Sequence, residues 1–62
     1  MLAENLKKAR EEKNLSQQKV AESVGVTQAA LHYFETGVKV PSVPVLMELS
    51  RVLGKTMDDL VN

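Results

Sequence analysis

The side chains best suited to chemistry lie on one short segment, and their chemistry is hydrogen bonding rather than catalysis. Gln28, Ala29, His32 and Tyr33 fall at i, i+1, i+4 and i+5, so they share one face of a helix formed there. A glutamine amide can pair with the N6 and N7 atoms of adenine, and an alanine methyl group can touch the methyl group of thymine. This face is therefore a candidate surface for reading DNA bases.

Three of these residues also have simpler interpretations, which the sequence leaves open. His32 is the only histidine, and as a solvated helix residue it needs no function. The ring of Tyr33 can lean on the apolar core instead of presenting its hydroxyl group outward. Gln28 can be an ordinary residue of a first helical turn.

The residues around this face have the spacing of a helix-turn-helix. Two short helices that cross steeply must approach closely at one point, and Ala21 is small enough to allow it. Gly25 can adopt the positive φ that ends the first of these helices. Thr27 caps the second helix, and Leu31 and Phe34 supply its core anchors. The spacing therefore predicts two helices joined by a tight turn.

Hydrophobic periodicity predicts five helices and no strands. Residues 2–13 have an amphipathic pattern, on a stripe that runs from Leu2 to Lys13, and Asn14 is the expected terminator. Gly37 closes the third helix and Gly54 the fourth. The other helices each follow a polar residue that can act as an N-cap: Ser16, Thr27, Ser42 and Thr56. Asp59, three residues after Thr56, completes a pattern that resembles a capping box, and Pro44 is tolerated in the first turn of its helix.

Length and composition set limits on the class of protein. We expect residues 1–62 to form a single domain near the lower size limit for independent folding, with no cysteine for disulfides. The apolar runs are too short for a membrane span or a signal peptide, so a soluble cytoplasmic protein is the simplest interpretation. Net charge is zero, with a mildly basic segment over residues 1–20 and a mildly acidic one over 21–62.

Catalysis is the function that the sequence supports least. Acid-base or nucleophilic catalysis needs a positioned group with an orienting partner, and the chain has one histidine, no cysteine and scattered carboxylates. We therefore expect no enzyme activity, no metal, no cofactor and no small-molecule ligand. The serious rival to DNA binding is a protein-interaction module on the same scaffold, which the neutral charge favours.

Five short motifs occur along the chain: Leu15-Ser16-Gln17, Ala21, Gly25-Val26-Thr27, Glu35-Thr36-Gly37 and Pro41-Ser42. Together they resemble the Cro/CI-type (Xre-like) helix-turn-helix repressors. The resemblance covers almost the whole chain, and each motif is weak alone but specific in combination. It implies an all-α, lambda-repressor-like domain of five helices whose second and third helices bind double-stranded operator DNA, as a homodimer.

The resemblance also implies roles for individual residues. Arg10 and Glu35 occupy the places of an ion pair between the first and third helices, although Arg10 can also be one more solvated charge. The implied base contacts come from Gln28, Ala29 and Tyr33, with His32 beside them. The implied phosphate contacts come from five positions: Ser16, Gln17, Thr27, Thr36 and Lys39.

Two departures from the family pattern weaken the expected DNA affinity. The loop after the third helix holds one basic residue, Lys39, where the phage repressors often have several. Ala29 and Ala30 stand where longer polar side chains commonly read bases, so Gln28 is the one side chain able to make a bidentate base contact. Binding as a dimer to a palindromic site therefore becomes more necessary.

Four apolar residues near the C-terminus have no obvious place in the predicted core. They are Val43, Met47, Met57 and Val61. We expect them to form a two-fold interface that is weak in free solution, because so small a domain rarely leaves that many apolar side chains exposed. The alternative is that Met57 and Val61 complete the core.

Overall fold

Polar caps and glycines divide the chain into five helices in the computed structural model, which describes all 62 residues. The helices are α1 (Leu2–Glu12), α2 (Gln17–Val24), α3 (Gln28–Thr36), α4 (Val43–Leu53) and α5 (Met57–Val61). There are no strands. The prediction of an all-α, five-helix fold is therefore confirmed.

Each helix after α1 begins at the N-cap that the sequence predicts. Ser16 Oγ accepts a hydrogen bond from the Lys19 N–H at 3.0 Å, and Thr27 Oγ1 accepts one from the Ala30 N–H at 3.0 Å. At the start of α5, Thr56 Oγ1 accepts from the Asp59 N–H, and the Asp59 carboxylate accepts from the Thr56 N–H. This reciprocal pair is a capping box, so the helix starts follow from local hydrogen bonding.

The first helix is one residue shorter than predicted. It ends at Glu12, and Lys13, which the sequence analysis placed on the inward stripe, is an exposed C-cap. The Lys13 N–H bonds to the Arg10 carbonyl at 3.1 Å, which tightens the last turn. Asn14 follows with a φ of 57°, a conformation that asparagine tolerates better than most residues. The chain therefore turns away from the helix at the residue that was expected to terminate it.

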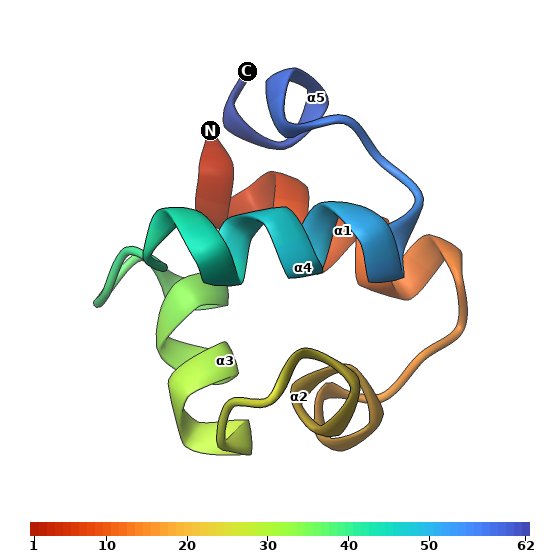
Figure 1. The fold of residues 1–62 in the computed structure, drawn as a ribbon, viewed down its shortest axis with the longest axis vertical. Coiled ribbons are helices and arrows are strands. Elements are labelled where there is room, and N and C mark those ends of the chain that lie inside the picture. Colours follow the sequence, from red (N-terminus) through yellow and green to blue (C-terminus); the bar gives the residue numbers. More distant parts are fainter.

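The five helices enclose one apolar core. α1 packs against α3, α4 and α5, while α2 packs against α3 and α4. In Figure 1, α1 and α4 run across the middle, with α5 above them and the pair α2 and α3 below. The core holds ten buried residues: Leu6, Ala9, Val20, Ala21, Leu31, Phe34, Leu46, Leu49, Leu53 and Leu60.

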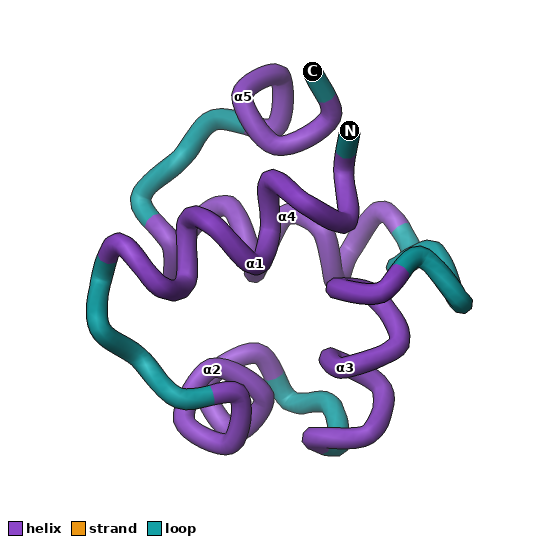
Figure 2. Tube along the Cα trace, turned by 180° about the vertical axis from the view of Figure 1, so that it is seen from behind, coloured by secondary structure: helices purple, strands orange, loops and turns teal.

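Both chain ends lie beside α5, as the front and back views agree (Figures 1 and 2). A hydrogen bond ties the two ends together, since Asn5 Nδ2 of α1 donates to the Leu60 carbonyl at 3.0 Å. The other end of the molecule carries α2 and α3. None of the five helices has the length and apolar character needed to cross a membrane.

The four apolar residues without a place in the predicted core differ in how far the structure buries them. Met57 is partly buried and packs against the core, as the alternative interpretation expects for this residue. Val43, Met47 and Val61 remain exposed, by 64%, 56% and 45% respectively. Val43 and Met47 lie four residues apart on α4 and therefore share one face of that helix.

The turn between α2 and α3 has the geometry that the sequence predicts. Gly25 adopts a φ of 88°, and its N–H bonds to the Ala21 carbonyl at 2.9 Å. The Val26 N–H bonds to the same carbonyl at 3.0 Å. Ala21 itself is 2% exposed, as expected for a residue at the closest approach of two helices.

This turn generates a first prediction. No heavy atom would lie within 4 Å of a Cβ added at Gly25, so a substitution there meets backbone strain but no steric obstacle. Gly25→Ala should lower the free energy of unfolding by about 1–2 kcal/mol, the cost of a left-handed backbone for an ordinary residue. Gly25→Asn is the matched control and should lose less, because asparagine visits that region more readily. Urea unfolding checks this, and equal stabilities of wild type and Gly25→Ala would contradict it.

Candidate nucleic-acid interface

The outward face of α3 is formed by the four residues that the sequence placed there. Gln28, Ala29, His32 and Tyr33 are all exposed, and together with Gln17 of α2 they line an open depression of about 470 Å³. The ring centroids of His32 and Tyr33 are 6.1 Å apart. The face thus combines two amide groups with two aromatic rings, and it joins α2 to α3.

A buried ion pair connects this helix to α1. Arg10 Nε donates to Glu35 Oε2 at 2.7 Å and Arg10 Nη2 donates to Glu35 Oε1 at 3.1 Å, so the contact is bidentate. The Glu35 side chain is 2% exposed and that of Arg10 is 12% exposed. The structure therefore brings together the two residues that were paired on the strength of the family resemblance.

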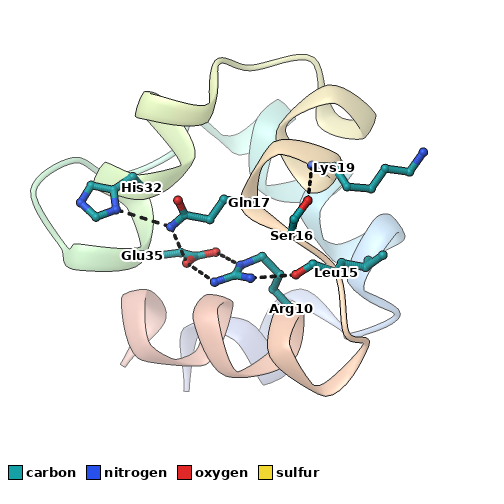
Figure 3. Close-up of polar contacts among 7 residues, drawn as sticks. All are labelled: Arg10, Leu15, Ser16, Gln17, Lys19, His32 and Glu35. Atoms are coloured by element: carbon teal, nitrogen blue, oxygen red, sulfur yellow. Dashed lines mark hydrogen bonds and ion pairs between the residues drawn. The ribbon is translucent and has the colours of Figure 1, made fainter.

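The guanidinium group of Arg10 has a third partner. Its Nη1 donates to the Leu15 carbonyl at 2.7 Å, in the segment that links α1 to α2 (Figure 3). The hydrogen bond to Glu35 raises the pKa of Arg10 above its already high ordinary value, so the guanidinium stays charged. No buried side-chain nitrogen or oxygen lacks a hydrogen-bond partner. One arginine thus fixes α1, the α1–α2 link and α3 relative to each other.

Gln17 extends the network to the exposed face. Its Nε2 lies 3.1 Å from Glu35 Oε1, to which it donates, and 3.4 Å from His32 Nδ1 (Figure 3). The family resemblance implies a phosphate contact for Gln17, and its place in this buried network is an additional role. No local pattern marks it, because the contact joins residues 15 and 18 positions apart on two different helices.

The structure places the other predicted phosphate contacts at the ends of the two helices. Ser16 and Thr27 cap α2 and α3, and a hydroxyl group that accepts a capping bond can still donate its proton. Thr36 closes α3, with its Oγ1 3.4 Å from the Tyr33 carbonyl. The ammonium group of Lys39, in the loop beyond, lies 5.2 Å from the centroid of the Tyr33 ring. All four side chains belong to exposed residues.

The fold and sequence together define the class of protein. Residues 6–60 match the family model described as helix-turn-helix, and the chain belongs to this family. The match agrees with the resemblance to Cro/CI-type repressors and confirms it. Over its whole length, with a TM-score of 0.92 and 30% identity, the chain is similar to SinR, a master regulator for biofilm formation whose crystal structure was solved in complex with DNA.

Two curated relatives come from Bacillus subtilis (strain 168). Both are 38% identical to the chain over 61 residues, or 98% of its length. One is the uncharacterized HTH-type transcriptional regulator YqaE and the other is the SPbeta prophage-derived, uncharacterized HTH-type transcriptional regulator YonR. The chain spans about half the length of each, 53% and 56% respectively. Both relatives are named as transcriptional regulators, the class of protein that the resemblance implies.

The buried pair generates a second prediction. Glu35→Ala should lower the free energy of unfolding by about 3 kcal/mol, because it leaves the Arg10 charge buried without its partner. Glu12→Ala is the matched control, since it removes a carboxylate from an exposed pair with Lys55, 3.4 Å away. That loss should stay below roughly 1 kcal/mol. Denaturant unfolding of both variants checks the difference, and equally mild effects would count against a structural role for the pair.

A double variant separates the charge from the packing. Arg10→Met combined with Glu35→Leu removes both charges while keeping apolar volume, so it should recover part of the stability that Glu35→Ala loses. Recovery should be incomplete, because the Leu15 carbonyl and the amide of Gln17 then lose their partners.

Proposed function

We propose that this chain binds double-stranded DNA and regulates transcription, with α3 reading base edges in the major groove. The observation that carries the proposal is the likeness to SinR over the full length of the chain, because the SinR structure was determined with DNA. The helix-turn-helix family match points to the same function. The relatives that are named as transcriptional regulators support it as well.

The exposed face of α3 supports base reading. Gln28 lies in its first turn with a free amide, which can make a bidentate contact to adenine N6 and N7. Ala29, beside it, is small enough to approach a thymine methyl group. Ser16, Thr27 and Lys39 flank this face with hydrogen-bond donors for phosphate oxygens, and such contacts fix the register of a protein on the duplex. Thr36 joins them when its hydroxyl group turns from the Tyr33 carbonyl to a phosphate.

We further propose that the protein acts as a repressor on a palindromic operator, as a homodimer that forms weakly in free solution. Two copies related by a two-fold axis can place their α3 helices about 34 Å apart, one turn of B-DNA. The exposed face of Val43 and Met47 on α4, with Val61 on α5, supplies apolar surface for such a contact. Because the loop after α3 holds one basic residue, Lys39, a single domain makes few phosphate contacts, and binding as two copies raises its affinity for DNA.

The rival function is a protein-interaction module on the same scaffold. The balance of eight basic and eight acidic residues favours it, because DNA-binding domains usually carry a basic excess. Selection of bound sequences from a random DNA pool decides between the two. An enriched palindrome is expected, and the absence of any enriched sequence would reject specific DNA binding and favour the rival.

A third prediction concerns base reading. On the selected operator, Gln28→Ala should cost about 1–3 kcal/mol of binding free energy and should relax the base preference at one position. Competition binding with single-base operator variants measures both effects. An equal loss of affinity on every sequence would rule out a base contact by Gln28.

Lys39→Ala is the matched comparison, because it removes a proposed phosphate contact beyond the same helix. It should weaken binding to all sequences alike and make the logarithmic salt dependence shallower by about one unit. Titrations at several salt concentrations give this slope. An unchanged slope would remove Lys39 from the phosphate contacts.

A fourth prediction concerns assembly. Sedimentation should show mainly monomer in free solution and two copies for each operator duplex, with binding that rises cooperatively with protein concentration. Met47→Glu should abolish the cooperativity, because it places a charge on the proposed apolar contact, and Glu22→Gln on α2 is a surface control. One copy per duplex at saturation would reject the homodimer and the palindromic site together.

A further inference from the structure

The buried carboxylate of Glu35 dictates how the Gln17 amide is oriented. An ionised carboxylate only accepts hydrogen bonds, and both oxygens of Glu35 already accept from Arg10. Gln17 can therefore face Glu35 Oε1, at 3.1 Å, only with its NH₂ group. The reversed amide would set a carbonyl oxygen against a carboxylate oxygen, with no proton between them. The orientation of the amide thus follows from the chemistry of the network.

The same NH₂ group faces the ring of His32. Gln17 Nε2 lies 3.4 Å from His32 Nδ1, and because an amide nitrogen donates but does not accept, the hydrogen bond between them is donated by Gln17. A nitrogen that faces a donor must accept, so Nδ1 is the unprotonated nitrogen of the neutral imidazole. The proton then resides on Nε2. Figure 3 shows this second ring nitrogen on the side of His32 away from Gln17.

We infer that the chain of bonds from Arg10 through Glu35 and Gln17 holds His32 in its Nε2–H tautomer, so that the exposed ring nitrogen is a hydrogen-bond donor matched to guanine. The partner rests on the proposed function, whereas the tautomer does not. Gln17 is a positioning residue in this arrangement, and His32 is a second base-reading residue beside Gln28.

Guanine follows from the pattern of groups in the major groove. It presents two adjacent acceptors, N7 and O6. In adenine the N7 acceptor lies next to an amino donor, thymine has a single acceptor, O4, beside a methyl group, and cytosine presents only an amino donor. A lone N–H donor is therefore best matched to guanine. His32 follows Gln28 by one helical turn on the same face, and both line the same depression, so the two can read different bases of one site.

The tautomer is tested on the free protein by nitrogen NMR of the imidazole ring, at a pH where the ring is neutral. His32 is the only histidine, so the two ring signals are unambiguous. The wild type should hold the proton on Nε2, and Gln17→Leu should weaken this bias, because it removes the amide that donates to Nδ1. Equal tautomer populations in wild type and a folded Gln17→Leu would overturn the inference.

The guanine contact is tested with operator DNA in which single guanines are replaced by 7-deazaguanine, which lacks the N7 acceptor. For the wild type, one replacement should lower affinity by up to about tenfold, as expected for one hydrogen bond. For His32→Ala the same replacement should have no effect, while replacements elsewhere act alike on both proteins. Gln17→Leu should reduce the sensitivity at that position.

The outcomes separate this inference from the proposed function. One outcome is that the wild type binds its operator and that every 7-deazaguanine replacement acts alike on wild type and His32→Ala. The guanine contact is then overturned, while DNA binding stands. If His32→Ala instead suppresses the effect of a single methylphosphonate linkage, the donor faces a phosphate and the guanine contact is again overturned. If no DNA is bound, the proposed function fails, and the guanine contact with it, while NMR still decides the tautomer.

Discussion

The structure depends on keeping the Glu35 carboxylate charged inside an apolar domain. A carboxylate that is 2% exposed needs hydrogen-bond donors, because burying an unpaired charge costs far more than a small domain can offset. Arg10 supplies two donors in a fixed fork and Gln17 supplies a third. Since these donors come from α1 and α2 while the carboxylate belongs to α3, satisfying one side chain determines how three helices meet.

Such a pair adds geometric definition more than stability. Apolar residues of similar volume often stabilise a core as well as a buried ion pair does, but they leave helices free to slide and rotate. A bidentate contact tolerates little rotation, because both guanidinium donors must keep their oxygens. The carboxylate also belongs to the last turn of α3, so the constraint reaches the helix whose other face is exposed. The orientation of the exposed face is thereby tied to the scaffold.

The sequence predicts the features that local chemistry decides. Ser16, Thr27 and Thr56 start helices by capping bonds to residues three positions on, so their pattern is visible along the chain. Long-range packing is not visible in this way. Met57 and Val61 are one helical turn apart and both apolar, yet only Met57 packs on the core, because the choice depends on contacts with other helices that no local pattern shows. The contact of Gln17 with Glu35 is hidden for the same reason.

The neutral charge of the chain gives the fixed network a further importance under the proposed function. Attraction to phosphates supplies most of non-specific DNA affinity, and a chain with eight basic and eight acidic residues has little of it. Discrimination between sites must then come from the direction and polarity of a few groups on α3. Each such group discriminates between bases only if its donor and acceptor positions stay fixed. A side chain that can rotate or change its tautomer can also bond to the wrong base. A buried charge that fixes the polarity of exposed side chains meets this need, because reversing Gln17 would leave Glu35 facing another acceptor.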